Sequence, residues 1–411
     1  MRVLQINKYH YLRGGAERYY FEASRLLEKA GHEVAFFSME GERNRPTPWS
    51  KHFLPETDYR REASFPARVR AAGRVIWNGD AYRSVLAVAA EFRPDVAHLH
   101  NIAHQLSGSV VAALRRAGVP AIQTLHDYKL ACPSYRRFRD GKPCDACRRY
   151  RFWNAVRYRC VLGSAPASAV AAAETAAYRG TKLYEKGVAF FHAPSRFLGD
   201  VMKGYGFPAE RIVHFPYTLD IGEYEPSDEE DGTFLFFGRL SPEKGLPVLL
   251  RAAARFPEAR IVVAGEGPER EGMEREAKAN GLSSVRFAGH LGGEDLRKAI
   301  RSCRAVLLPS EYDDNSPLVI YESFAYGKPV IGAERGGIPE MVRAGETGLL
   351  FPPSDGEALA AAMKTLQGDP GRARRMGAEA RRRMETVYGP DAHLEKLLAL
   401  YERAMASATT G

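Results

Sequence analysis

The stretch FLFFGRLSPEKGLPVLLRAAARF, residues 234–256, decides the fold of this chain. It starts as an apolar run typical of a buried strand, turns at Gly238, and continues from Leu246 with apolar residues at helical spacing. The loop between them carries Arg239 and Lys244. Ligands of doubly wound α/β folds bind at the carboxyl ends of the strands, where helix N-termini offer free N–H groups to phosphate. The loop is therefore either a diphosphate site or a surface turn with a salt bridge.

Alternation of strands and helices continues through both halves of the chain. Apolar strand-like runs separated by helical patterns are typical of parallel sheets covered by helices on both faces. We expect strands in the first half at 3–7, 32–38, 95–101, 120–127 and 188–195, and in the second half at 234–237, 260–267, 285–290, 305–310, 328–333 and 348–351. The sequence thus predicts an α/β protein with two Rossmann-like, doubly wound parallel-sheet domains.

A boundary between the two domains is expected near residue 220. The chain has 411 residues, more than one hydrophobic core usually covers. The segment IGEYEPSDEEDG, 221–232, is acidic and polar and reads as a linker or hinge. We predict a first domain over 1–220 and a second over 221–411, facing a cleft, with the last helices (371–407) packing back on the first domain.

Composition describes an ordinary globular protein with an excess of positive charge. Hydrophobic residues make up 45% and charged residues 27%, and the net charge is +9. No apolar run is long enough to span a bilayer, and the first residues lack the layout of a signal peptide, so we expect a cytoplasmic protein. The charge favours nucleic acid, anionic lipid or nucleotide phosphates as partners, or reflects only an arginine-rich coding bias.

Four loops of the second half follow strands and therefore meet at one sheet edge. Besides the Arg239 loop, Gly265, Glu266 and Gly267 follow one strand and permit close approach of a ligand to the backbone. Ser316 and Pro317 suit the start of a helix after the strand at 305–310, and GGIPE (336–340), after the strand at 328–333, forms a further glycine turn into a helix. Neither a Gly-x-Gly-x-x-Gly fingerprint nor a P-loop is present, which disfavours NAD binding and NTP hydrolysis.

The motifs together resemble the family 4 glycosyltransferases, retaining enzymes of the GT-B fold. The matching segments are GGAER (14–18), GRLSPEKG (238–245), GEGP (265–268), NSPLVIYESFAYGKPVI (315–331) and GGIPE (336–340). The resemblance implies transfer of a sugar from a UDP- or GDP-linked donor to a hydroxyl of a glycan or lipid-linked acceptor, with retention of configuration. Two alternatives stay open: a nucleic-acid-binding protein on a degenerate sugar-nucleotide fold, and a nucleotide-sugar epimerase.

Roles for individual residues of the second half follow from the resemblance. Arg239 and Lys244 would hold the donor's diphosphate, and Glu322 the ribose hydroxyls, unless Glu322 instead pairs with Lys328. Asp314 stands where the family usually has a second Glu near the donor sugar, and Glu311 is the alternative carboxylate. We expect no catalytic metal, because the two cations supply the charge. The remaining donor-binding candidates are Gly238, Gly265, Glu266, Gly267, Ser316, Pro317 and Leu318.

Candidates of the first half lie at the ends of its strands. Gly14 and Gly15 open a helix, so their N–H groups would face the donor phosphates or the acceptor, or simply form a tight turn. His126 follows a strand and is expected to hydrogen-bond the transferred sugar. A retaining reaction normally uses a carboxylate nucleophile, and Asp127, next to His126, is the nearby candidate. The resemblance instead implies transfer on the front face of the sugar without a protein nucleophile. We expect His10, His98 and His100 to serve packing or acceptor contacts.

An insert at 128–160 carries four of the five cysteines. Cys132, Cys144, Cys147 and Cys160 would form a structural zinc site or remain free thiols, while Cys303 is isolated and expected to be inert. Eight arginines lie between residues 129 and 159, interleaved with aromatic residues. This mixture suits single-stranded nucleic acid, or an anionic membrane surface or lipid-linked diphosphate acceptor. We prefer the acceptor or membrane role over nucleic acid.

Overall fold

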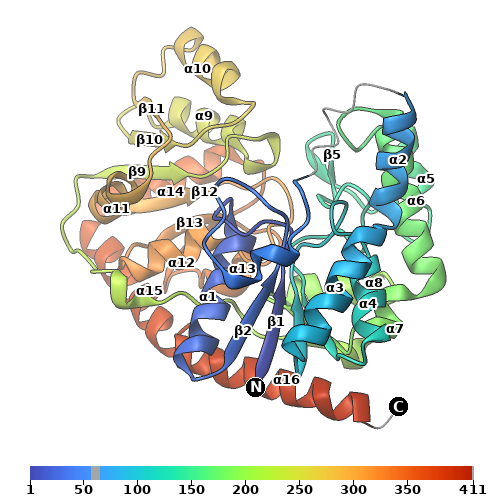
Figure 1. Cartoon of the computed structure of the whole chain (residues 1–411). Coiled ribbons are helices and arrows are strands. Elements are labelled where there is room, and N and C mark those ends of the chain that lie inside the picture. Colours follow the sequence, from blue (N-terminus) through green and yellow to red (C-terminus); the bar gives the residue numbers. More distant parts are fainter. Residues whose placement is uncertain (57–64, 410–411) are drawn as a thin grey trace. The chain divides into compact units, whose positions relative to one another are not determined.

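The chain folds into two compact units in a computed structural model that describes residues 1–56 and 65–409 (Figure 1). The first unit comprises Met1–Arg137, Cys144–Tyr217 and Pro390–Gly411. The second comprises Phe138–Pro143 and Thr218–Gly389. The main division therefore lies between Tyr217 and Thr218, where the sequence predicts a boundary at 220.

The first unit is built around a parallel sheet of six strands in the order β2-β1-β3-β4-β7-β8. Its strands are β1 (Arg2–Ile6), β2 (Glu33–Phe37), β3 (Val96–Leu99), β4 (Ala121–Thr124), β7 (Phe190–Ala193) and β8 (Ile212–His214). Its helices are α1 (Gly15–Lys29), α2 (Phe65–Ile76), α3 (Gly79–Phe92), α4 (Ser109–Arg116), α5 (Trp153–Arg157), α6 (Ala165–Thr181), α7 (Leu183–Gly187), α8 (Arg196–Gly204) and α16 (Pro390–Thr409).

Local sequence explains these elements. Strands β3 and β4 are buried along their whole length, as expected for parallel strands covered on both faces. The side chain of Asn78 accepts hydrogen bonds from the N–H groups of Asp80 and Ala81, which caps the start of α3. Helices and strands share one hydrophobic core that includes Leu4, Val85 and Phe191.

The second unit contains another six-stranded parallel sheet, in the order β11-β10-β9-β12-β13-β14. Its strands are β9 (Thr233–Phe237), β10 (Arg260–Ala264), β11 (Val285–Gly289), β12 (Ala305–Leu308), β13 (Val330–Ala333) and β14 (Gly348–Phe351), with the small hairpin β5 (Phe138–Arg139) and β6 (Lys142–Pro143) grouped with this unit. Its helices are α9 (Leu246–Arg255), α10 (Arg270–Ala279), α11 (Gly293–Ser302), α12 (Leu318–Ala325), α13 (Ile338–Met341), α14 (Gly356–Gly368) and α15 (Pro370–Thr386).

Strand order in the second sheet fixes where its loops meet. Counted from β9, the order is that of the Rossmann fold, 3-2-1-4-5-6, and it reverses between β9 and β12. The loops after these two strands lie side by side at the carboxyl edge, the position at which open α/β sheets bind ligands. The predicted fold class of two doubly wound parallel sheets is confirmed, and the switch point of the second sheet falls at the Arg239 loop.

The acidic linker is fastened to the second unit. Lys328 is buried and donates hydrogen bonds from its ammonium to the carbonyls of Ser227 and Glu229. Arg304 forms two hydrogen bonds with the carboxylate of Glu230, at 2.7 and 3.1 Å. These bonds satisfy buried cations with fixed partners, so the segment from 227 to 230 belongs structurally to the second unit.

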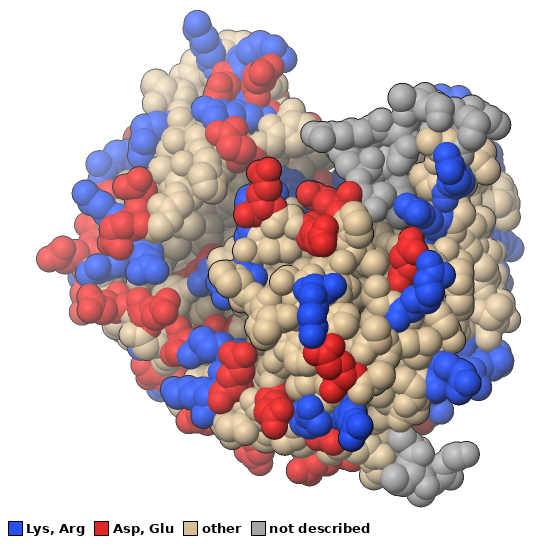
Figure 2. Space-filling model, viewed as in Figure 1, with Lys and Arg blue, Asp and Glu red and all other residues tan. Residues whose placement is uncertain are grey.

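The C-terminal helices divide between the units. Helix α15 belongs to the second unit and packs on α12. Helix α16 belongs to the first, where it contacts α1, β3 and β4. Within the described residues, no helix combines the length and apolar character needed to cross a membrane. On the face shown in Figure 2, basic and acidic side chains are interspersed over the second unit.

Candidate functional site

Arg239 and Lys244 both lie in the loop after β9, as the sequence predicts, but their surroundings differ. The Arg239 side chain is exposed and, among the described residues, forms no hydrogen bond or ion pair. The Lys244 side chain is mostly buried, and its ammonium lies 2.7 Å from the Asp314 carboxylate of the loop after β12. One cation is thus free at the switch point, and the other is held in place.

Asp314 is the centre of a polar cluster. Its carboxylate accepts a hydrogen bond from the Tyr312 hydroxyl at 2.8 Å and from the Ser310 hydroxyl at 3.2 Å, in addition to its pair with Lys244. The side chain is 7% exposed. The carboxylate expected near a donor sugar therefore faces Lys244 in this structure, and it orients that ammonium. Tyr312 and Ser310 were not among the sequence candidates.

The alternative carboxylate, Glu311, points to a different partner. One of its oxygens accepts a hydrogen bond from Ser354 at 2.5 Å, in the loop after β14. The other oxygen is buried and has no hydrogen-bond partner among the described residues. Glu311 thus lies outside the cluster formed by Lys244 and Asp314.

The glycines of the edge loops allow the loops to contact one another. A Cβ built on Gly265, whose φ is +146°, would lie 1.8 Å from the carbonyl oxygen of Gly238. The close approach that we predicted for a ligand at Gly265 is therefore made by the backbone of the neighbouring loop. Gly336 has φ +60°, and its Cβ would lie 2.3 Å from the carbonyl oxygen of Asp314. A side chain at either position would push the loops apart.

Other residues of these loops lie on the surface of the same edge. Gly238 has no atom within 4 Å of an ideal Cβ, so the space beside it is open. Glu266 is exposed and pairs with Arg270 on α10. Gly267 lies against the backbone of Leu240, just as Gly265 lies against the backbone of Gly238.

Helix α12 begins at this edge with Pro317 as its N-cap residue. Ser316 is buried, and its hydroxyl bonds to the Tyr321 hydroxyl at 2.9 Å, so its side chain is not the cap. The N–H groups of Leu318 and Val319 open the helix and suit an anion, whereas the Ile320 N–H donates to the Pro317 carbonyl at 3.0 Å. Glu322 is half-buried on the second turn. The alternative that Glu322 pairs with Lys328 receives no support, because the Lys328 ammonium bonds to the linker carbonyls.

In the first unit, Gly14 precedes α1 with an extended backbone, at φ −171°. Gly14 and Gly15 are both exposed. An ideal Cβ on Gly14 would make only an ordinary contact, 3.8 Å from Glu17. Neither backbone strain nor lack of space therefore requires glycine at position 14. The N-terminus of α1, a helix of 15 residues, begins at these exposed residues.

His126 lies after β4 and both of its ring nitrogens are occupied. Nδ1 is 2.7 Å from the Tyr217 hydroxyl, and Nε2 is 3.0 Å from Nδ1 of His100. Burial lowers the pKa of His126 to about 3, so the ring is neutral at pH 7. Neither nitrogen is available to a sugar while these bonds persist. Asp127 next to it has a pKa raised by burial, and its carboxylate accepts a hydrogen bond from the Lys129 N–H.

Two further histidine candidates of the first unit, His98 and His10, are buried. His98 is fully buried, with Nδ1 2.8 Å from the Tyr401 hydroxyl and Nε2 2.7 Å from the Thr124 hydroxyl. His10 is buried among aromatic rings and bonds to the Tyr20 hydroxyl at 2.9 Å. Of the two expected roles, the structure favours packing for both residues.

The five cysteines are free thiols in the structure. Among residues 1–56 and 65–409, no group of three or more His, Cys, Asp or Glu side chains is placed to hold a metal ion. Burial raises the pKa of the Cys147 thiol to about 12, and the nearby thiols of Cys132, Cys160 and Cys144 add to this rise, so the four thiols lie near one another. The zinc site stays a prediction. Burial raises the pKa of Cys303 to about 12, which agrees with its expected inertness.

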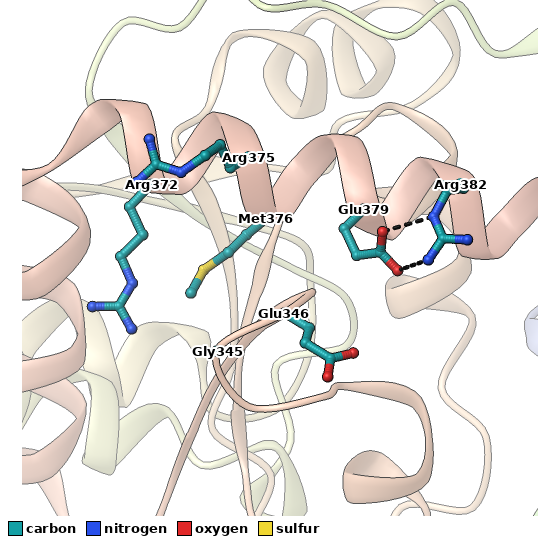
Figure 3. A pocket seen from close by; sticks show the side chains of 7 residues that line it. All are labelled: Gly345, Glu346, Arg372, Arg375, Met376, Glu379 and Arg382. Atoms are coloured by element: carbon teal, nitrogen blue, oxygen red, sulfur yellow. Dashed lines mark hydrogen bonds and ion pairs between the residues drawn. The ribbon is translucent and has the colours of Figure 1, made fainter.

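A pocket of about 530 Å³ lies elsewhere on the second unit (Figure 3). Arginines and Glu379 of α15 line one side and the turn at Gly345 and Glu346 the other, with Arg382 bonded to Glu379. This turn precedes β14, whereas the candidate loops follow their strands. The pocket is therefore at the amino edge of the parallel sheet, opposite the candidate site.

Comparison with known proteins assigns both halves of the chain. Residues 14–218 match the family model described as glycosyl transferase 4-like domain, and residues 221–383 match the model described as glycosyl transferases group 1. The sulfoquinovosyl transferase SQD2 of Arabidopsis thaliana is 28% identical over 297 residues, covering 69% of this chain and 52% of that protein. The O-antigen chain mannosyltransferase C of Escherichia coli is 32% identical over 201 residues, covering 48% of this chain and 51% of that protein. The chain thus spans about half the length of these curated relatives.

Solved structures share the fold over nearly the whole chain. The sucrose-phosphate synthase of Thermosynechococcus elongatus superposes with a TM-score of 0.72 at 20% identity and covers 99% of both chains. Anabaena Alr3699/HepE, solved in complex with UDP, gives a TM-score of 0.66 at 18% identity over 97% of this chain and 99% of that one. With both halves matched in order and the sheets arranged as described, the chain belongs to the GT-B glycosyltransferases built from a glycosyl transferase 4-like domain and a glycosyl transferases group 1 domain.

Proposed function

We propose that this protein transfers a sugar from a nucleotide-diphosphate sugar to a hydroxyl of a glycan or lipid-linked acceptor, with retention of anomeric configuration. The observation that carries the proposal is the pair of cations at the switch point: Arg239 is exposed and has no partner within the described part of the chain, and Lys244 is fixed by Asp314. The solved structures of Anabaena Alr3699/HepE with UDP and with UDP-glucose make a UDP-linked donor the first choice. The curated relatives named for sulfoquinovosyl and mannosyl transfer support the reaction class.

The chemistry requires stabilisation of a leaving diphosphate. The bond between the sugar C1 and the diphosphate oxygen breaks, a new bond forms from C1 to the acceptor oxygen on the same face, and the acceptor's proton passes to the departing phosphate. Negative charge develops on that phosphate, and fixed cations stabilise it most at that stage. Arg239 and Lys244 take this role in the proposal, with the first N–H groups of α12 binding the distal phosphate.

Recognition of the nucleoside is assigned to Glu322. Its carboxylate accepts hydrogen bonds from both ribose hydroxyls, and its half-buried position on α12 agrees with this role. Gly14 and Gly15 of the first unit bind phosphate or acceptor through the N-terminus of α1. His126 reaches the transferred sugar only after its bond with Tyr217 or His100 is exchanged for one with the ligand.

No divalent metal takes part in this proposal, because the arginine and lysine carry the charge that Mg²⁺ would otherwise supply. We propose further that the protein acts in polysaccharide or glycolipid synthesis, in the cytoplasm at the inner face of a membrane. The matched models and the named relatives are glycosyltransferases, so the nucleic-acid-binding and epimerase alternatives receive no support.

A donor-binding experiment tests the proposal with a matched control. UDP, GDP and ADP are titrated into the wild-type protein, Arg239→Ala and Arg255→Ala by calorimetry, and release of UDP or GDP from the corresponding sugar nucleotides is measured with and without EDTA. Arg255 is also an exposed arginine next to the same sheet, but at the far end of α9. We expect Arg239→Ala to lose about 10- to 100-fold in binding or rate, since a charge-assisted hydrogen bond contributes about 1.5–3 kcal/mol.

The control and the metal result have defined outcomes. Arg255→Ala is expected to match the wild type, and EDTA is expected to change nothing. Equal loss in both arginine variants, or no binding of any of the three nucleotides, contradicts the donor site. Loss of activity with EDTA that Mg²⁺ restores contradicts the metal-free mechanism.

A further inference from the structure

A patch of exposed apolar side chains stands out on the first unit. Tyr150, Trp153, Tyr158 and Leu162 are exposed by 61%, 57%, 38% and 66%. They belong to α5 and the turns on either side of it, beside α6 (Figure 1). Large apolar groups gathered on a surface cost free energy in water and mark interaction sites.

These side chains are not exposed because the segment lacks a hydrophobic core of its own. Phe152, directly before Trp153, is 5% exposed and forms a small buried cluster with Cys147, Ala155 and Ala172 of α6. The side-chain amide of Asn154 donates a hydrogen bond to the Ala146 carbonyl at 2.6 Å. The segment therefore has its own interior and holds Trp153 outward on a fixed base.

Backbone conformation supports the same conclusion. Tyr150 has φ +62° and Leu162 has φ +54°, the left-handed region in which glycine is the least strained residue. The sequence nevertheless has large side chains at both positions, and both are exposed. The Tyr150 ring packs edge-on against the buried Phe152, and its hydroxyl accepts a hydrogen bond from Arg179. Leu162 belongs to no hydrophobic core cluster of the described residues, so nothing in a core offsets its strain, which indicates a use outside the fold.

Charge identifies the kind of partner. From Ala146 to Ala173 the chain has no Asp or Glu, and its five arginines are all exposed: Arg148, Arg149, Arg151, Arg157 and Arg159. Among the described residues, Arg149, Arg151 and Arg159 form no ion pair, whereas exposed arginines elsewhere do, such as Arg83 with Asp80 and Arg382 with Glu379. The patch thus combines apolar groups with uncompensated positive charge.

We propose that this patch, Tyr150, Trp153, Tyr158 and Leu162 with Arg149, Arg151, Arg157 and Arg159, docks the first unit on an anionic lipid membrane. Trp and Tyr favour the headgroup level of a bilayer, and arginines near the surface attract anionic lipids. Trp153 and Arg157 are four residues apart on α5 and share a face, so they reach the same surface. A second copy of the chain is a poor occupant, because the arginines would repel. The proposal deepens the proposed function for a lipid-linked acceptor, but the docking itself needs no catalysis.

The test is vesicle binding of the full chain without donor. Protein is sedimented with phosphatidylcholine vesicles and with vesicles in which roughly one lipid in three is phosphatidylglycerol. Two pairs of variants are compared: Trp153→Ser with Trp77→Ser, and the double change Arg149→Gln and Arg151→Gln with the double change Arg115→Gln and Arg116→Gln. Trp77 is 49% exposed, and Arg115 and Arg116 are exposed on α4, so each control removes the same chemistry elsewhere on the first unit.

We expect binding to the anionic vesicles only. Each arginine near the surface contributes about 5-fold, so the double arginine change is expected to weaken binding about 25-fold, while its control stays near the wild type. Trp153→Ser is expected to weaken binding and Trp77→Ser is not. Thermal melting of each variant verifies that it is folded.

Other outcomes overturn the proposal. Equal binding to both vesicle types, or equal loss in test and control variants, contradicts an anionic membrane at this patch. Binding of a short single-stranded RNA that competes with vesicles and is lost in the same test variants assigns the patch to nucleic acid. Arg239→Ala is included because it removes the proposed activity but not the docking, so failure of one proposal is distinguishable from failure of the other.

Discussion

Asp314 and Lys244 show how one carboxylate sets the charge of the candidate donor site. In the structure Asp314 partly neutralises the ammonium that is proposed to meet the diphosphate. Replacing Asp314 with Asn keeps one acceptor oxygen, for the Tyr312 hydroxyl, replaces the oxygen that accepts from Ser310 and Lys244 with an amide NH2, and removes the negative charge that pairs with Lys244. We expect Asp314→Asn to bind UDP more tightly, by about 3- to 10-fold, because the Lys244 ammonium then acts on the diphosphate without an opposing carboxylate beside it.

The same variant separates binding from turnover. If Asp314 touches the donor sugar or orients Lys244 for the leaving phosphate, kcat falls while UDP binding improves. Calorimetry with UDP and steady-state kinetics measure the two effects, and Ser310→Ala, which retains the ion pair, is the control. Weaker UDP binding in Asp314→Asn would contradict the assigned role of the pair.

At the scale of elements, the docking of α16 depends on neutral histidines. His393 on α16 bonds to the Pro216 carbonyl at 3.0 Å and to the Tyr19 hydroxyl at 3.1 Å, and Tyr401 on the same helix bonds to His98. Burial lowers the pKa of His393 to about 4. The pKa values of the other buried histidines in this network are also lowered by burial, namely His98, His100, His126 and His192.

These shifts predict acid sensitivity of the first unit. Unfolded histidines bind protons below about pH 6.5 but the folded ones do not, so the unfolded state binds more protons and stability falls as pH decreases from 6.5 toward 4. Between these pH values, each such histidine lowers the free energy of unfolding by about 1.4 kcal/mol for each unit by which the pH decreases. Glu17 and Asp127, whose pKa values burial raises, oppose the loss at lower pH. Urea unfolding between pH 7 and 5 measures the slope.

A variant tests the assignment of this slope. His393→Gln removes one of the depressed groups and is expected to make the slope shallower by about one proton, whatever its effect on stability at pH 7. A substitution of the exposed His290, which has no such network, is the control. An unchanged slope in His393→Gln would show that this histidine is not neutral in the folded protein.

At the scale of the whole molecule, two separate cores predict two unfolding events. Phe234, Leu249 and Ile331 belong to the core of the second unit, and no residue is shared with the core of the first. UDP is proposed to bind residues of the second unit and stabilises only the folded form of what it binds. We expect calorimetry to resolve two transitions, with UDP raising the midpoint of one, and lower pH decreasing the midpoint of the other. A single transition that shifts as a whole with UDP would show that the units unfold together.

The sequence predicts the sheets better than the contacts at their edges. Strands of the second half correspond to apolar runs, of which those of β9, β10 and β11 end at a glycine, and each lies within a few residues of its expected position. Helices α2 and α3, strand β8 and the hairpin of β5 and β6 were not among the expected elements. Strands β5, β6 and β8 are only two or three residues long, too short for a periodic pattern. Strand order placed Lys244 and Asp314 in adjacent loops, but their pairing depends on side-chain direction. The bonds of His126 to Tyr217 and His100 join distant segments, which local patterns do not encode.

Placement of α16 also has a consequence for the order of events during synthesis. The first unit consists of residues from the beginning of the chain and of Pro390–Gly411. A ribosome therefore produces nearly all of the first unit, then the whole of the second, before the partners of Tyr19 and His98 on α16 emerge. The nascent first unit has those polar groups unpaired until the second unit has been synthesised, and α16 can dock only after that.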